Sequence, residues 1–372
     1  MDQRRQHGPR LSRVDFSING TQGRLTTMSA LTFIPVNPSV EDCWRGIILY
    51  GQNSASYKFA LAESLLHLSP QSGQLIKLED LAPVFGKAIA EHISHSPKQG
   101  TNPGKFLQSV KNYNADGNLD ELVKATVAGG FQNVIDAFHN IGSSSVFHKF
   151  FIDERKANKG IRITDEFSKL SEGLQIDNIT QEVNSRWRLV ETAWNLGIAA
   201  NHLVVQHDHE LGEIFTFDSA RRRKAVTSSR GALNGYQKGR CFYCNANLHL
   251  LGEDFNTDVD HFFPHKLKQS SLHMNLDGVW NLVLACQSCN RGVSGKFDRI
   301  PSQRFLELLH KRNEFLIGSH HPLRETLINQ TGDTLDKRVG FLSKIYQEVQ
   351  LNPSSAWEPE HEFDLDGDPE TS

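Results

Sequence analysis

The 372-residue sequence contains few sulfur-bearing residues, with five cysteines and three methionines, and it lacks long apolar runs. No stretch of about 18 consecutive apolar residues occurs, so we predict no membrane span and no membrane partner. The first residues lack the apolar segment of a secretory signal, and we predict a cytoplasmic protein. Because thiols stay reduced in that compartment, metal binding or core packing explains the cysteines better than disulfides do.

Two common catalytic motifs are also missing. The segment "RGVSGK", residues 291–296, has some likeness to a phosphate-binding loop but lacks the G-x4-G-K-[ST] spacing. The G-x-S-x-G motif of serine hydrolases does not occur. We therefore expect neither an ATPase motor nor a serine hydrolase.

Charge is distributed unevenly along the chain. The net charge of −3 argues against a generic nucleic-acid binder. Residues 219–252 nevertheless contain no acid, and residues 352–372 contain no lysine or arginine. The basic residues of the first stretch are Arg221, Arg222, Arg223, Lys224, Arg230, Lys238 and Arg240. Because local fields decide where a polyanion binds, residues 219–240 are a candidate nucleic-acid contact, the alternative being a solvated loop.

We predict an α+β fold with five parts. Residues 1–27 are polar and form a disordered leader, although Met28 is a plausible start and the sequence does not decide between Met1 and Met28. Residues 28–218 form a mainly helical regulatory or substrate-recognition domain, and 219–318 a small nuclease domain. Residues 319–352 form a C-terminal helical segment. Residues 353–372 form an acidic disordered tail that aids solubility or, alternatively, mimics DNA and inhibits the protein.

Local patterns within the first 218 residues indicate helices and two hairpins. Ser39, with Asp42 three residues later, is an N-cap candidate. The apolar positions 183, 187, 190 and 194 recur at helical spacing. The segments "FHKFFIDERKANKGIRI" and "HLVVQHDHELGEIFTFD" predict hairpins that turn near residues 158–160 and 211–212. Helices followed by a hairpin suit either a winged-helix-like DNA reader or a helical scaffold, and we favour the scaffold.

Several polar or reactive residues allow two interpretations. Cys43 beside Trp44 is expected to pack in a core. Trp187 is either a core residue flanked by solvated Arg186 and Arg188 or part of a nucleic-acid stack, and we favour the core. The histidines of the second predicted hairpin are expected to be surface strand residues, with metal ligation as the alternative. They are His202, His207 and His209.

Four cysteines form two C-x2-C pairs, Cys241 with Cys244 and Cys286 with Cys289. Two such pairs can close a tetrahedral four-thiolate shell around one zinc ion. A shell of this kind leaves no open position, so we predict one structural Zn²⁺. The interval between the pairs is long, and the zinc would hold the two ends of an inserted element together.

The inserted element carries polar residues of a different kind. Asp260 offers a carboxylate oxygen and Asn290 an amide oxygen, donors that suit Mg²⁺ or Mn²⁺. His261 has the side chain whose ordinary pKa lies near neutrality, as a general base requires. Asn281 lies where a strand is expected to begin and could hydrogen-bond the backbone around His261.

Residues 241–301, with "DVDHFFP", "WNLVLACQSCNRG" and a following lysine and aspartate, resemble the HNH endonucleases. These enzymes are also called ββα-metal or His-Me finger nucleases, and the likeness is greatest to the variant braced by two CxxC zinc knuckles. It implies a two-stranded ribbon and a helix around one catalytic metal. His261 would be the base, Asn281 would orient it, and Asp260 and Asn290 would hold Mg²⁺ or Mn²⁺.

The resemblance implies a metal-dependent endonuclease that hydrolyses phosphodiester bonds, in DNA rather than RNA. The expected phosphate contacts are His265, Arg291, Lys296, Arg221, Arg222, Arg223 and Lys224; His265 departs from the family pattern, and a surface histidine is the alternative there. The appended helical domain favours a bacterial restriction or anti-phage defence effector with a partner protein. Alternatives are a catalytically silent zinc-dependent nucleic-acid-binding or scaffolding protein, and an RNA-cleaving toxin. Whether it forms a homodimer stays open.

Overall fold

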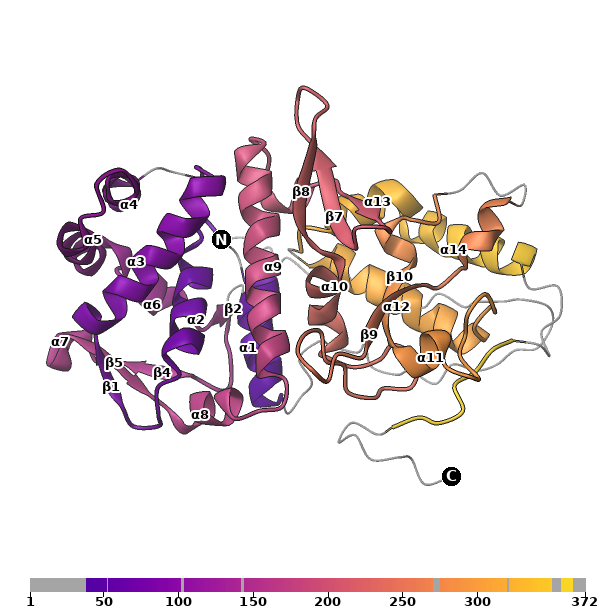
Figure 1. The fold of residues 1–372 in the computed structure, drawn as a ribbon, viewed down its shortest axis with the longest axis horizontal. Coiled ribbons are helices and arrows are strands. Elements are labelled where there is room, and N and C mark those ends of the chain that lie inside the picture. Colours follow the sequence, from indigo (N-terminus) through magenta and orange to yellow (C-terminus); the bar gives the residue numbers. More distant parts are fainter. Residues whose placement is uncertain are drawn as a thin grey trace, which may run out of the picture.

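A computed structural model describes residues 38–51, 53–101, 104–141, 144–269, 275–319, 321–349 and 356–363. Helices and small sheets form two groups, one on each side of the long helix α9, Ile176–Asn195 (Figure 1). The chain is therefore of mixed helix and sheet, as the α+β prediction requires. The leader and both candidate start residues lie outside the described residues.

The first group consists of helices with two small sheets. Its helices are α1 (Val40–Tyr50), α2 (Tyr57–Leu68), α3 (Leu78–His95), α4 (Lys105–Asp116), α5 (Leu119–Ala125), α6 (Val134–Ala137), α7 (Arg155–Asn158), α8 (Asp165–Ser171) and α9, with a π-helical turn at Thr126–Gly130. Its strands are β1 (Leu75–Lys77), β2 (Asn140–Ile141), β3 (Ser144–Ser145), β4 (Phe151–Asp153) and β5 (Gly160–Ile163). The order β1-β5-β4 shows that the first predicted hairpin exists and gains a third strand.

Local signals in this group act as expected. Ser39 caps α1, and its hydroxyl accepts from the Asp42 amide at 3.1 Å while the Asp42 carboxylate accepts from the Ser39 amide at the same distance. The apolar face of α9 is buried, including Trp187. Cys43 is fully buried in the same core, as predicted. Arg186 was expected to be solvated but is only 2 % exposed, because it projects into the interior of the fold from the inner side of α9.

The second group contains a three-stranded sheet, a two-stranded sheet and the C-terminal helices. Its strands are β6 (Gln206–Asp208), β7 (Glu213–Phe217), β8 (Arg223–Ser228), β9 (Thr257–His261) and β10 (Leu282–Cys286). Its helices are α10 (Ser229–Gln237), α11 (Gln287–Arg291), α12 (Gln303–Gly318), α13 (Arg324–Thr331) and α14 (Leu335–Val349). Short 3-10 turns lie at Ala200–His202, His265–Gln269 and Val279–Asn281.

The second hydrophobic core begins before the predicted boundary at residue 218. Leu203, Val205 and Ile214, near or in β6 and β7, pack with the core that includes β9 and β10. Helix α9 contributes to both cores, because Val183 and Trp187 lie in the first, whereas Leu189 lies in the second. The β6-β7 hairpin therefore packs with the second group, although it precedes the basic stretch.

Residues 356–363 fall in the segment predicted to be a disordered tail, and the structure differs there. Trp357 is 3 % exposed and pairs with Pro301 in an isolated bridge. The amide of Phe363 donates to the Cys244 carbonyl at 2.8 Å. Contacts of Trp357 and Phe363 hold this acidic stretch against the rest of the protein, although its charged composition predicted disorder. The remainder of 353–372 lies outside the described residues.

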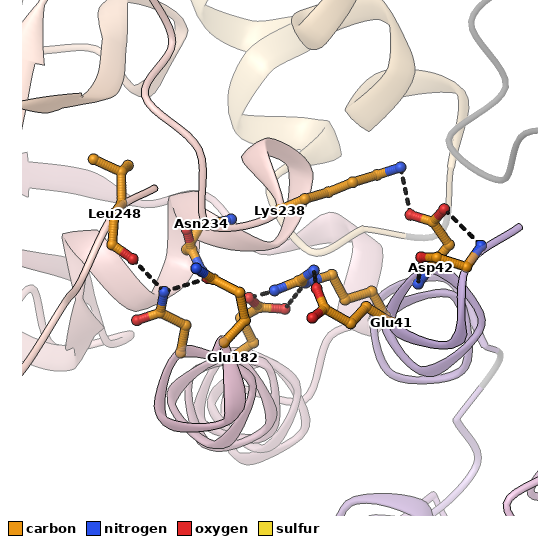
Figure 2. A network of polar contacts seen from close by, with 11 residues as sticks. Glu41, Asp42, Glu182, Asn234, Lys238 and Leu248 are labelled. Atoms are coloured by element: carbon orange, nitrogen blue, oxygen red, sulfur yellow. Dashed lines mark hydrogen bonds and ion pairs between the residues drawn. The ribbon is translucent and has the colours of Figure 1, made fainter. Parts of the chain in front are cut away.

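The two groups meet at a buried polar network between α1, α9 and α10 (Figure 2). The guanidinium of Arg45 lies 2.9 Å from Glu182, whose other carboxylate oxygen accepts from Asn234 at 2.6 Å. Arg45 and Glu182 are almost fully buried. Lys238 reaches Asp42 at 2.5 Å at the edge of the network. A buried, paired network fixes one docking geometry, because each charge needs its partner. Among the described helices, none has the length and apolar character to cross a membrane.

Candidate functional site

The four predicted zinc cysteines meet in one place. Cys241 and Cys244 lie in the turn before β9, whereas Cys286 ends β10 and Cys289 lies in α11. Their sulfur atoms all lie within 4.8 Å of one another, and all four residues are buried free thiols. Hydrogen bonding with the Cys241 thiol lowers the pKa of Cys244 and of Cys286. Four close, buried thiols could bind a metal such as zinc.

Strands β9 and β10 pair antiparallel, and α11 follows β10 directly. The register places Leu282 opposite His261 and Val283 opposite Asp260. Neighbouring residues of a strand point to opposite faces, so Asp260 and His261 diverge. Asp258 and Asp260 share one face, on which Asn290 and Arg291 of α11 contact Asp258. The two adjacent residues singled out in the sequence thus belong to two different environments.

Asp260 lies in a closed polar pocket. Its Oδ1 accepts from the Lys296 ammonium at 3.0 Å, and its Oδ2 accepts from the Tyr243 hydroxyl at 2.6 Å. Asp260 is 6 % exposed and Lys296 is fully buried. Burial raises the pKa of Asp260 and lowers that of Lys296. Lys296 therefore neutralises Asp260 from inside the fold, and the lysine predicted to contact phosphate is engaged there.

The second predicted metal ligand, Asn290, lies against a different carboxylate. Its amide donates to Asp258 Oδ2 at 3.0 Å, and Arg291 donates to the same oxygen at 2.8 Å. Within the described residues, the groups of three or more histidine, cysteine, aspartate or glutamate side chains placed to hold a metal do not include Asp260. The pairing of these two residues around Mg²⁺ or Mn²⁺ stays a prediction.

His261 lies close to three other histidines and one aspartate. We call these five residues the histidine group: His207, His209, His261, His265 and Asp277. Ligand atoms of His207, His209 and His261 lie within 4.8 Å of one another, and so do those of His261, His265 and Asp277. Asp277 Oδ1 lies 3.2 Å from His261 Nε2 and 2.5 Å from His265 Nε2. Sheet β6-β7-β8 and strand β9 thus bring together residues more than fifty positions apart.

The histidine group is buried on one side and open on the other. His207 and His261 are 7 % and 6 % exposed, whereas His209 is exposed and His265 half-buried. Burial lowers the pKa of His207 to about 4 and that of His261 to about 3. Both imidazoles are therefore neutral at pH 7, with a lone pair available on one ring nitrogen.

His207 has a fixed orientation and an unused nitrogen. Its Nδ1 lies 2.8 Å from the Ser229 hydroxyl at the start of α10. Its Nε2 is buried and makes no hydrogen bond to any residue that the structure describes. The prediction that the segment's histidines lie on the surface is therefore wrong for His207. The alternation of His207 and His209 at the end of an expected strand was the available signal, although β6 ends at Asp208 and His209 lies in the turn that follows.

Two residues fix the backbone around His261. Asn281 accepts from the Phe263 amide at 2.8 Å and donates to the Phe263 carbonyl at 3.0 Å. Lys296 donates to the His261 carbonyl at 2.9 Å. Asn281 thus makes hydrogen bonds to the nearby backbone, as its position in the sequence suggested, and Lys296 was not expected to take part.

Residues 219–228 of the basic stretch form the turn and the second strand of the β7-β8 hairpin, which projects from the body (Figure 1), and the stretch continues into α10. Arg222 pairs with Asp218 at 2.8 Å, and Arg223 pairs with Asp208 at 2.9 Å. Arg221 and Lys224 are exposed and form no ion pair in the described part of the chain. Of the four phosphate contacts predicted at residues 221–224, two are therefore already partly neutralised.

Comparisons with models of protein families, with curated proteins and with solved structures found no match for this chain.

Proposed function

We propose that this protein is a metal-dependent endonuclease that hydrolyses phosphodiester bonds in DNA, with the histidine group as its reacting centre. The observation that carries the proposal is the buried Nε2 of His207 beside His261 and His209, an atom to which no described residue makes a hydrogen bond. A buried polar atom without a partner costs about 1–3 kcal/mol, so such an atom indicates a ligand or an ion.

The donors of the histidine group fit a divalent ion. Imidazole suits Zn²⁺ better than Mg²⁺ or Mn²⁺, which prefer oxygen donors. A second hydrogen bond normally orients a ligating histidine, and Ser229 does this for His207. His207, His209 and His261 would hold the ion. It would supply a positive charge for a phosphate oxygen and a water of lowered pKa.

The chain's own residues provide position and access. Asn281 and Lys296 fix the backbone of His261, and Asp277 contacts both His261 and His265. His209 and His265 stand on the open side, where a phosphate would arrive. His261 serves here as an ion ligand, a role that differs from the proton acceptor implied by the resemblance, and Asp260 stays paired with Lys296.

The surroundings support a nucleic-acid substrate. Exposed Arg221 and Lys224 on the β7-β8 hairpin offer sequence-independent contacts to a phosphate backbone. The large helical group joined to this centre supports a wider role as a restriction or defence effector, in which that group selects the substrate or a partner. The alternative role is a catalytically silent zinc-dependent nucleic-acid-binding or scaffolding protein, in which only the four cysteines would bind a metal.

A cleavage assay tests the activity. Supercoiled plasmid and a structured RNA are incubated with the full chain and Mn²⁺, Zn²⁺ or Mg²⁺. We expect nicking of plasmid that is lost in His207→Ala and His261→Ala. The matched control is His202→Ala, an exposed histidine outside the group. Absence of cleavage with every ion would favour the scaffold, and cleavage of RNA alone would favour the toxin.

Metal analysis separates the two roles of His261. Wild-type protein should bind one ion at the cysteines and a second at the histidine group. His207→Ala and His261→Ala should each lose only the second ion. If His261→Ala abolishes cleavage and keeps both ions, His261 is the proton acceptor instead, and the second ion lies elsewhere.

A further inference from the structure

A cavity of about 420 Å³ lies between α2 and α9 in the helical half of the molecule. The two helices pack against each other, and Phe59 of α2 stacks on Trp187 of α9 with ring centroids 6.1 Å apart (Figure 1). Residues three or four positions apart share a face of a helix, so Glu63 and Leu66 follow Phe59 along the face of α2 that meets α9. Six of the residues that line the cavity carry the argument: Glu63, Leu66, Thr180, Gln181, Val183 and Asn184.

The carboxylate of Glu63 faces this cavity without a partner. Glu63 is half-buried, and its Oε2 is buried and accepts no hydrogen bond from any residue that the structure describes. His67 also lines the cavity, but it is exposed, and among the described residues neither it nor any lysine or arginine forms an ion pair with Glu63. Burial raises the pKa of Glu63, as expected for a carboxylate whose lost hydration is not replaced. Burying an unpaired carboxylate is costly, so Glu63 calls for a donor of positive charge.

The lining favours a small organic cation over a metal ion. The cavity is far larger than the roughly 30 Å³ that one water molecule takes in the liquid, and it has the size of a small-molecule site. Among the described residues, the groups of three histidine, cysteine or carboxylate side chains placed to hold a metal do not include Glu63. Leu66 and Val183 offer apolar surface for a short carbon chain. The amides of Gln181 and Asn184 add neutral hydrogen-bonding groups.

We propose that this cavity binds a small aliphatic amine, whose ammonium pairs with Glu63 and whose carbon chain lies along Leu66 and Val183. An ammonium that donates to a carboxylate forms a charge-assisted hydrogen bond, which is about twice as strong as a neutral one. The site lies outside the histidine group and the four cysteines, and it does not rest on the proposed nuclease activity. Because α2 and α9 both line the cavity, a bound amine would stabilise the packing of these two helices.

Calorimetric titration of the full chain at constant ionic strength tests the site. Three probes share a four-carbon chain and differ at the polar end, namely butylamine, butan-1-ol and butyrate, and Mg²⁺ is the metal probe. We expect butylamine to bind and to raise the melting temperature, and the alcohol and the acid to bind at least about tenfold more weakly. Absence of butylamine binding, or equal binding of butylamine and butan-1-ol, would overturn the proposal. Displacement of butylamine by Mg²⁺ would overturn it in favour of a metal site.

Variants locate the binding. Glu63→Gln keeps the shape of the side chain and removes the unpaired charge, so the protein should fold at least as stably as wild type. It should weaken butylamine binding by about tenfold or more, the expected loss of one hydrogen bond to a charged group. Glu79→Gln, at an exposed glutamate in the first turn of α3, is the matched control and should bind butylamine normally. Unchanged affinity in Glu63→Gln would refute the assignment of the ammonium to this carboxylate.

Discussion

The ammonium of Lys296 lies 3.0 Å from Oδ1 of Asp260, and neither residue is open to solvent. Lys296 also reaches the carbonyl of His261, so one side chain holds both the Asp260 carboxylate and the backbone of His261. A divalent ion at Asp260 would have to displace this ammonium. Asp260, which the sequence predicts to be a metal ligand, is therefore one partner of a buried ion pair.

Breaking this pair on one side should destabilise the fold. Lys296→Ala leaves Asp260 as an uncompensated buried charge, a loss of about 3–5 kcal/mol in the free energy of unfolding. The double variant Asp260→Asn with Lys296→Met should be more stable than Lys296→Ala, because no charge stays buried. Urea unfolding measures both. Lys266→Met is the matched control, since Lys266 and Asp298 are exposed and 3.9 Å apart, and it should change stability by less than about 1 kcal/mol.

The four cysteines should bind one zinc ion that the second half needs for folding. Cys286→Ser should lose about one zinc per chain, because a three-thiolate shell binds the ion weakly, and the β9-β10-α11 unit should unfold. Elemental analysis and circular dichroism measure the two effects. Cys43→Ser removes a buried thiol from the other core and should keep the zinc. A zinc content unchanged in Cys286→Ser contradicts the four-cysteine site.

His139 should make stability depend on pH. Its Nε2 accepts from the Phe150 amide at 3.0 Å, which requires the neutral ring, and burial lowers its pKa to about 3. Between about pH 6.5 and pH 3 the unfolded chain therefore binds a proton at this residue and the folded chain does not. The free energy of unfolding should fall with falling pH, by up to about 1.4 kcal/mol per pH unit.

The variant His139→Gln isolates this contribution, because its side-chain oxygen can accept the same hydrogen bond without titrating. Urea unfolding at pH 7, 6 and 5 should give a smaller slope for His139→Gln than for wild type. His67→Gln, at an exposed position, is the control for the loss of a histidine. Parallel slopes for wild type and His139→Gln would show that the ring is not held neutral by the fold.

The junction in Figure 2 should couple the two halves. Glu182→Ala leaves Arg45 buried with Glu41 as its nearest carboxylate, a loss of about 3–5 kcal/mol. It should also separate the unfolding transitions of the two cores in calorimetry. Lys238→Ala removes a pair between the 32 %-exposed lysine side chain and Asp42 at the edge of the network, and it should destabilise the protein less than Glu182→Ala does, with one transition retained. A single transition in Glu182→Ala would show that apolar contacts alone join the halves.

If the β7-β8 hairpin binds DNA, Arg221 and Lys224 should account for most of its contribution to the salt-dependent affinity. Changing both Arg221 and Lys224 to Ala should reduce the slope of log affinity against log salt concentration by about 1.8, or 0.9 for each phosphate contact. Arg222→Ala should have a smaller effect, because Asp218 already neutralises this side chain. Equal slopes for wild type and the double variant would remove the hairpin from the interface.

Short-range signals in the sequence predicted much of the local structure. The Ser39 cap, the hairpins near residues 160 and 212, and the convergence of two C-x2-C pairs depend on residues that are close in the chain or on a known ligand geometry. Periodicity likewise predicted the buried face of α9. The causes of the cap, the hairpins and the helix periodicity act over a few residues, so these patterns are visible without the fold. The two cysteine pairs lie far apart in the chain and were predicted to meet because four thiolates complete one zinc shell.

The sequence by itself determined the chemistry available: four thiols for a metal, a carboxylate and a histidine side by side, and a basic stretch. Tertiary structure alone decided the partners. Lys296 reaches Asp260, His207 approaches His261, and Arg186 turns inward, because packing brings together segments whose separation carries no periodic signal. Burial then fixes what each group can do, since a charge removed from water must find its partner inside the fold.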